Sequence, residues 1–295
     1  MITNEPSTQQ TPLPSEPGGD QEQLVEMPPQ PVSQTASNEP WIAFLIGIFT
    51  WFGSVLLLIF VPAILAMPYA IYRWRTSGLP NIEAITTDKA FIFLSIVAIL
   101  PSHLLTLGLV WFVVTRAGRY PFWKTVGFEW PRNINPAVGT VTCVAVAVTL
   151  LIIGFAVTYF WGGNKTQLDV LIESSIAARF ATAFVAVFTA PLVEEVVYRG
   201  VLYSGLERAL GTINRTIGTA VAFAVVSLLF AGVHVFQYID NVSVITVITL
   251  LSFSLTAVRA YTGKVLPSFI IHLVFNGIQS IIIVLSPFIR WSGSS

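Results

Sequence analysis

Charge-free hydrophobic stretches recur along most of the chain after residue 40. The first covers residues 41–67, about 27 residues, and is long enough to cross a hydrocarbon core of about 30 Å as a helix. Later stretches predict further spans at residues 90–115, 136–161, 180–203, 217–239, 242–258 and 266–289. Segments of these lengths are predicted to be helices, because backbone polar groups find no water inside a bilayer. The pattern therefore predicts seven membrane-spanning helices, or eight if residues 169–178 add a broken or re-entrant segment.

The N-terminal 40 residues have a different composition. They are rich in Pro, Gln, Ser, Thr and Glu and contain no Lys or Arg. Such a segment buries too little apolar surface to offset the entropy of ordering, so residues 1–40 are predicted to form a disordered tail. Two further regions are predicted to follow, with N-terminal transmembrane helices at 41–165 and a second group of transmembrane helices at 166–290.

The overall composition supports the same class. Hydrophobic residues make up 54% of the chain and charged residues 10%, whereas a soluble domain carries about 25% charged residues. The fold class is therefore predicted to be an all-α, polytopic transmembrane helix bundle in a lipid bilayer. The formal net charge is zero, which gives no electrostatic basis for binding nucleic acid. The loops on the membrane side of the N-terminus contain about eight Lys and Arg residues, which include Arg259 and Lys264 after the sixth span. The loops on the opposite side contain about six. This difference slightly favours a cytoplasmic N-terminus.

Two adjacent glutamates interrupt the fourth apolar stretch. A charge at the bilayer centre costs about 2.5–3.5 kcal/mol on the insertion scale, so Glu194 and Glu195 are expected to face the bundle interior or a water-filled cavity. Arg199 is four residues after Glu195 and can pair with it on one helix face. Glu194 is rotated from Glu195 by about 100°, so the two carboxylates make different contacts. The alternative is a structural ion pair with a spare carboxylate.

Polar residues also occur in the later spans. Phe230 precedes His234 by one helical turn, and His272 shares a helix face with Asn276. At 1.5 Å per residue, these groups and Glu194 lie at depths of roughly 12–24 Å from one side, which allows them to meet. A lone intramembrane histidine is often a hydrogen-bonded packing residue, and His103, which has no partner motif, is predicted to be one.

Together these residues resemble the motifs of a known family. Glu194-Glu195-x3-Arg199, Phe230-x3-His234 and His272-x3-Asn276 occur in this order in separate apolar segments. They resemble the three motifs of the CPBP intramembrane proteases, a group that includes the CAAX prenyl endopeptidases and the bacterial Abi and bacteriocin-immunity proteins. The resemblance covers about residues 180–285, and it implies that the helices of residues 166–290 form the catalytic transmembrane core. One departure is Tyr198, where the family often has Phe.

The resemblance implies a hydrolase, an intramembrane endopeptidase that cleaves a membrane-embedded or lipid-anchored protein. A multi-pass location in the bacterial plasma membrane is expected. Glu194 would be the general base that activates water, a role for which a carboxylate needs a pKa near the working pH. His234 would hold that water, and His272 and Asn276 would stabilise the oxyanion. Glu195 and Arg199 would support the site. Phe230 and Arg199 would also contact the substrate.

Several alternatives remain open. Glu, His and His suit a catalytic zinc, but the chain lacks the His-Glu-x-x-His helix of many zinc peptidases. A metal-free mechanism is therefore preferred, with zinc as the alternative cofactor. The alternative function is a non-catalytic scaffold or bacteriocin-immunity protein of the same fold. A proton-coupled carrier is less favoured, because the sequence has no evident internal repeat.

Overall fold

The computed structural model describes residues 40–78, 84–85, 87–235, 238 and 241–288. Within these ranges the regular structure is helical and contains no strand, so the predicted all-α class is confirmed. The predicted disordered tail lies outside the described residues except for Pro40, which begins the first helix.

Among the residues that the structure describes, seven helical segments are long and apolar enough to cross a membrane. They are Pro40–Thr76, Lys89–Val114, Pro136–Trp161, Ile176–Gly211, Arg215–Val235, Val242–Thr262 and Leu266–Leu285. The eighth segment considered at residues 169–178 does not form a span. Most of it lies in the eight-residue helix α7 (Gln167–Ser174), and a span needs about 20 residues.

Several helix ends follow from local sequence. Asp88 caps α3 (Lys89–Val97) by accepting from the backbone N–H groups of Ala90 and Phe91. Asn135 caps α6 (Pro136–Trp161) in the same way, and a proline at the first helical position needs no N–H partner. α12 (Val242–Thr262) ends at Gly263, whose φ of 68° is left-handed and favours glycine.

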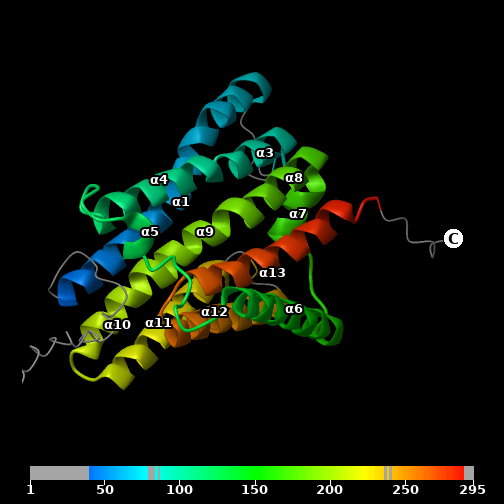
Figure 1. Ribbon diagram of the computed structural model, residues 1–295. Helices are drawn as coiled ribbons and strands as arrows, with labels where there is room; N and C mark the ends of the chain where they lie inside the picture. The colour runs from blue at the N-terminus through cyan, green and yellow to red at the C-terminus, as the bar shows by residue number, and fades with distance from the viewer. Residues whose placement is uncertain (1–39, 79–83, 86, 236–237, 239–240, 289–295) are drawn as a thin grey trace, which may run out of the picture. The chain divides into compact units, whose positions relative to one another are not determined.

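The fourth span contains two π-helical segments. It runs through α8 (Ile176–Phe184), η1 (Val185–Thr189), α9 (Ala190–Glu194), η2 (Glu195–Leu202) and α10 (Tyr203–Gly211). In Figure 1 this green helix passes between two groups of helices. α1 (Pro40–Ser77), α3 and α4 (Ile99–Val114) pack on one side of it, whereas α13 (Leu266–Leu285), α12 and α6 lie on the other. The glutamates are therefore carried on the central helix of the bundle.

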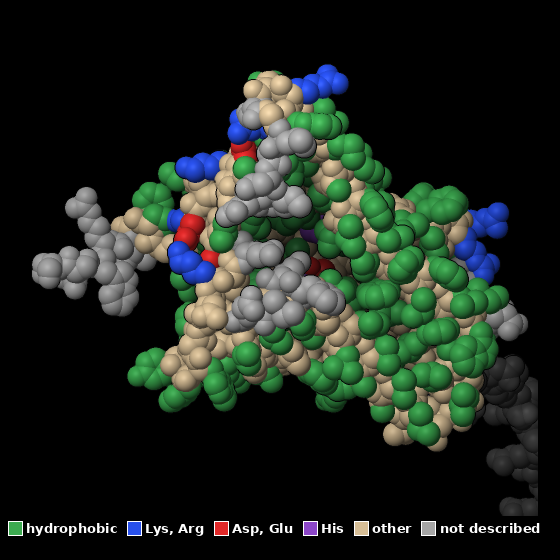
Figure 2. All heavy atoms as spheres, turned by 180° about the vertical axis from the view of Figure 1, so that it is seen from behind, with side chains coloured by type: hydrophobic (Ala, Val, Ile, Leu, Met, Phe, Trp, Pro, Cys, Tyr) green, Lys and Arg blue, Asp and Glu red, His purple; other side chains and the backbone are tan. Residues whose placement is uncertain are grey.

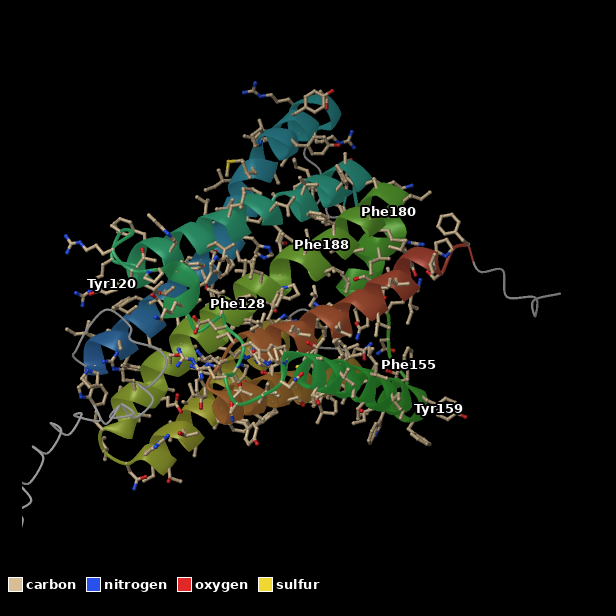
Figure 3. The ribbon with its side chains drawn as sticks, in the orientation of Figure 1. Tyr120, Phe128, Phe155, Tyr159, Phe180 and Phe188 are labelled. Atoms are coloured by element: carbon tan, nitrogen blue, oxygen red, sulfur yellow. The ribbon has the colours of Figure 1, made fainter. Side chains whose placement is uncertain are left out.

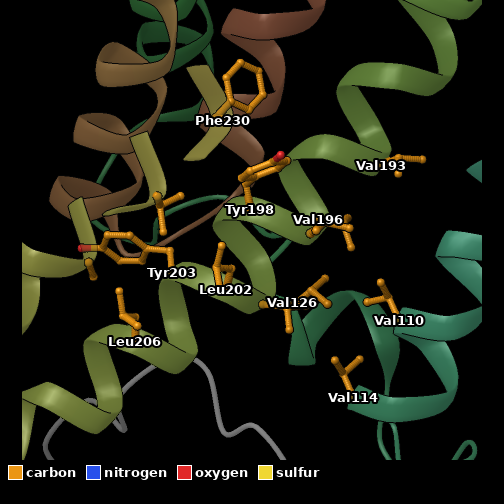
Figure 4. Packing of buried hydrophobic residues seen from close by; sticks show 14 residues of the cluster. Val110, Val114, Val126, Val193, Val196, Tyr198, Leu202, Tyr203, Leu206 and Phe230 are labelled. Atoms are coloured by element: carbon orange, nitrogen blue, oxygen red, sulfur yellow. The ribbon is translucent and has the colours of Figure 1, made fainter. Parts of the chain in front are cut away.

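Two main apolar clusters hold these helices together. One surrounds η2 and α10 and includes Val110 from α4, Val126 after the short helix α5 (Phe122–Thr125), and Phe230 from α11 (Arg215–Val235). In Figure 4, Phe230 lies beside Tyr198, and Val126 lies between Leu202 and Val110. The second cluster joins α6, α12 and α13. The first cluster therefore packs α4 and α11 against the glutamate segment, and the second packs the last two spans against α6.

The surface is largely hydrophobic. Figure 2 shows apolar side chains over most of one face, with Lys and Arg side chains toward its edges. On α6, Phe155 is 60% exposed and Tyr159 84% exposed, and Figure 3 shows both at the outer side of that helix. Exposed apolar surface of this extent is expected for helices that contact lipid.

Candidate active site

The two glutamates lie at the junction of an α-helical and a π-helical segment. Glu194 is the last residue of α9, and Glu195 is the first residue of η2. The Glu195 side chain is fully buried, whereas 23% of the Glu194 side chain is exposed. Inserted π turns are frequent at functional sites because they shift side chains relative to the regular helical pattern. The junction gives the neighbouring carboxylates different surroundings.

Glu195 is held by two donors on one oxygen. Its Oε1 accepts from Arg199 Nη1 at 3.0 Å and from His272 Nδ1 at 3.0 Å. The first contact is the i,i+4 pair expected from the spacing. A buried carboxylate is costly unless its charge is compensated, and the guanidinium supplies that compensation. Glu195 is therefore committed to internal contacts.

The Arg199 guanidinium is tied to α12 as well. Its Nη2 lies 3.1 Å from Ser252 O, 3.2 Å from Ser252 Oγ and 3.2 Å from Thr256 Oγ1. The guanidinium carbon lies 4.5 Å from the centroid of the Phe230 ring. Both Arg199 and Phe230 are buried, at 0% and 2% exposure. Arg199 therefore joins η2 to α12, while its predicted contact with substrate, and that of Phe230, remain predictions.

His272 lies between the two glutamates. Its Nδ1 donates to Glu195, because a carboxylate can only accept, and its Nε2 lies 3.7 Å from Glu194 Oε2. The ring is 3% exposed. The distance to Glu194 is too long for a direct hydrogen bond. The structure thus brings His272 beside the two glutamates, although it lies 77 residues after Glu195, a convergence that the predicted depths allowed.

His234 is fixed by its own helix. Its Nδ1 lies 2.8 Å from Phe230 O, and a carbonyl only accepts, so this nitrogen carries the proton. The His234 and Phe230 rings have centroids 4.8 Å apart, and the Phe230 and His272 rings 5.9 Å apart. Phe230 therefore packs against both histidines, and the neutral His234 ring keeps an acceptor at Nε2.

Asn276 contacts the other π-helical segment. Its Nδ2 donates to Ala186 O in η1 at 2.9 Å. One amide hydrogen is used in this bond, and a second remains on the same nitrogen. The bond attaches α13 to the helix that carries the glutamates. The predicted role of Asn276 as an oxyanion donor stays a prediction.

Comparison with known proteins agrees with this arrangement. Residues 176–278 match the family model described as Type II CAAX prenyl endopeptidase Rce1-like. The resemblance to the CPBP and CAAX proteases is confirmed over this region. No curated protein and no solved structure matches the chain. Residues 176–278 contain all three motifs, and together with the seven apolar helices they identify an integral, multi-pass membrane protein.

The candidate zinc ligands lie among residues 176–278. The hydrogen bonds at His272 Nδ1 and His234 Nδ1 leave both Nε2 atoms available, as metal-binding histidines usually have them. A catalytic zinc needs three protein ligands around one point. Within the described part of the chain, no group of three or more His, Cys, Asp and Glu side chains converges in this way, so the arrangement in this structure does not fit zinc.

The sequence pattern predicted that Arg259 lies in the loop after the sixth span, and this prediction is wrong. α12 continues to Thr262, and Arg259 is 2% exposed inside the bundle. Its Nε donates to Arg199 O at 3.1 Å, and its Nη2 donates to Ser204 Oγ at 2.8 Å. The guanidinium lies 5.1 Å from the Tyr203 ring centroid. These contacts with the backbone and with an aromatic ring compensate for the burial of the guanidinium. The spacing of residues in the sequence does not reveal them.

Tyr238 is a second residue that the sequence did not indicate. It lies between α11 and α12. Burial raises the pKa of Tyr238 to about 12, and the charges of Asp169 and Glu194 act in the same direction. Its hydroxyl is therefore protonated at neutral pH and can donate a hydrogen bond. In Figure 2, acidic and histidine side chains are visible inside a hollow of the face shown.

Proposed function

We propose that this chain is an intramembrane endopeptidase that hydrolyses a peptide bond of a membrane-embedded or lipid-anchored protein, in the bacterial plasma membrane. The observation that carries the proposal is the difference between the two carboxylates. Glu195 is neutralised by Arg199 and His272, whereas Glu194 has no bond to an arginine among the described residues and is partly exposed. A partly exposed carboxylate beside histidines is the group that can exchange protons with water and substrate.

Glu194 is assigned the role of general base and then general acid. It removes a proton from water while the water oxygen forms a bond to the carbonyl carbon of the substrate. The tetrahedral intermediate collapses when Glu194 returns that proton to the amide nitrogen, and the C–N bond breaks to give a carboxylic acid and an amine. His234 Nε2, an acceptor in the neutral ring, holds the water by its second proton.

His272 is assigned to the oxyanion. Its Nδ1–H is held by Glu195, so a protonated ring presents Nε2–H on the side of Glu194. The remaining amide hydrogen of Asn276 is the second proposed donor. Removing one such preorganised donor costs about 3–4 kcal/mol in the transition state. Glu195 and Arg199 support this geometry because they fix the orientation of the His272 ring.

The proposal is tested with purified protein in proteoliposomes. Fluorogenic peptides with and without a lipid-modified C-terminal cysteine are offered to wild type, Glu194→Gln and Glu173→Gln. Glu173 is a matched control, since it is an exposed glutamate that pairs with Lys165 away from the site. We expect Glu194→Gln to lower kcat by about 10²–10⁴, the contribution of a general base, and Glu173→Gln to retain activity. Folded wild type that cleaves no peptide would instead favour the scaffold or immunity function.

A further inference from the structure

The third histidine of the chain also lies beside the glutamate helix. His103 on α4 is 7% exposed, and its Nδ1 lies 2.8 Å from Thr189 Oγ1. α4 packs against both η1 and α9. Thr189 precedes Glu194 by five residues, at the junction of these two segments. Thr189 and His103 are separated by 86 residues in sequence, which explains why no motif revealed the contact.

The hydrogen bonds determine which nitrogen of His103 carries the proton. Thr189 Oγ1 lies 3.2 Å from Val185 O, and a carbonyl only accepts, so the single hydroxyl proton is donated there. Thr189 Oγ1 must then accept from His103, which places a proton on Nδ1. The neutral ring therefore keeps its lone pair at Nε2.

Thr189 occupies a distorted position in the helix. Its φ is −112° and its ψ is −42°, whereas an α-helical residue has φ near −63°. The turn that begins there ends at Glu194. Groups with an ionic or electrostatic interaction with the Glu194 carboxylate are His272, His103, Tyr198 and Tyr238. His103 alone among these four also bonds to the turn that sets the rotation of Glu194 about the helix axis.

We propose that His103 is a positioning residue of the active site, which fixes the Glu194 turn through its hydrogen bond to Thr189. The proposal rests on the proposed peptidase function for its kinetic effect. Small displacements of a reacting group can cost about 10²-fold in rate. We therefore expect His103→Leu and Thr189→Val each to lower kcat by about 10–100-fold, with KM changed less than twofold.

The kinetic test uses three comparisons. His103→Asn keeps a donor near the position of Nδ1 and is expected to recover most of the kcat lost in His103→Leu. The double variant His103→Leu/Thr189→Val is expected to be no slower than the slower single variant, because both substitutions break one contact. Melting temperatures verify that each variant is folded. Unchanged kcat in folded His103→Leu, or additive losses in the double variant, would overturn the proposal.

A second measurement does not depend on activity. The chain has three histidines, so a protein labelled with ¹⁵N only in histidine gives few signals, and His103→Asn assigns those of His103. We expect the Nδ1–H tautomer and a shift of Nδ1 in Thr189→Val but not in Glu173→Gln. The opposite tautomer, or an unchanged Nδ1 signal in Thr189→Val, would contradict the placement. If wild type lacks peptidase activity the proposed function fails, while this experiment still decides the role of His103.

Discussion

At the residue scale, burial and charge compensation separate the functions of neighbouring side chains. Glu195, Arg199 and His272 form a connected set with contacts of 3.0 Å on the same carboxylate oxygen. A buried charge that loses its partner is far less stable than the intact pair. The set therefore works as one unit, and substitutions within it should not be additive.

Removal of the arginine tests this unit. We expect Arg199→Met to destabilise the protein by about 3–5 kcal/mol, because Glu195 becomes an uncompensated buried charge. Glu195→Gln/Arg199→Met should be more stable than Arg199→Met alone, since the second change removes that charge. Thermal unfolding in detergent measures both variants, with Glu173→Gln as the control. A double variant that is less stable than Arg199→Met would show that the ion pair does not govern stability here.

The motif residues were predictable from sequence because their spacing is local. Glu195 and Arg199 are four residues apart, and His234 bonds to Phe230 four residues earlier. Contacts across the bundle were not predictable. The His103 to Thr189 bond joins residues 86 positions apart, and the sequence had placed His103 as an ordinary packing histidine. This hydrogen bond depends on how α4 packs against the central helix, and no local sequence pattern indicates that packing.

At the element scale, the hydrophobic pattern predicted the helices better than their ends. The third span is observed at its predicted bounds, and the sixth extends through Arg259 to Thr262. The sixth span was predicted to end at residue 258 because Arg259 is charged. The hydrogen bonds of Arg259 to Arg199 O and Ser204 Oγ stabilise it inside the bundle. The π-helical segments η1 and η2 were not predicted, because the hydrophobic pattern does not distinguish them from α-helix.

The cap of α3 predicts a pH-dependent contribution to stability. The N–H of Phe91, followed by Tyr69 and other donors, lowers the pKa of Asp88 below its ordinary value. Its stabilising effect is therefore complete above the unfolded pKa of about 3.9 and is lost as pH falls through the folded pKa. We expect Asp88→Ala to cost about 1 kcal/mol at neutral pH.

The measurement is the melting temperature of wild type and Asp88→Ala between pH 7 and pH 3. The difference between the two proteins should shrink as the pH decreases below about 4, because the wild-type carboxylate becomes protonated. A difference that stays constant over this range would show that the Asp88 charge does not contribute.

Close packing of α1 on α10 predicts a steric effect at a glycine. A Cβ at Gly205 would lie 2.5 Å from Ala43 O, which is backbone and cannot rotate away. We expect Gly205→Ala to separate the two helices and to destabilise the protein by about 1–3 kcal/mol, as overpacking does. Gly108→Ala on α4 is the control, because nothing lies within 4 Å of its Cβ. Equal melting temperatures of the two variants would refute the close contact.

At the scale of the whole molecule, seven spans place the start of α1 and the end of α13 on opposite sides of the membrane. The side on which α1 begins was predicted to be cytoplasmic from about eight Lys and Arg against six. Arg259 is buried in α12, so it leaves this count and the excess falls to about seven against six. Lys264 is also partly buried and pairs with Glu129 at 2.7 Å. The positive-inside rule therefore gives the two orientations nearly equal weight.

The arrangement of the last four spans accounts for the site. α11 and α13 pack on the central helix, and α12 is bonded to it through Arg199 and Arg259, so residues from four separate segments converge although each motif is short. The match over residues 176–278 covers these spans, whereas α1, α3, α4 and α6 lie outside it. The earlier helices nevertheless contribute, because α4 supplies His103 and α1 packs on η2 and α10.

The central claim is that Glu194 makes this protein a peptidase. The most direct measurement compares protein termini in membranes of cells that express wild type or Glu194→Ala at equal levels. We predict new termini that appear only with the wild type, and these would also name the substrates. Identical termini, with both proteins folded and inserted, would contradict the account and favour the scaffold or immunity function.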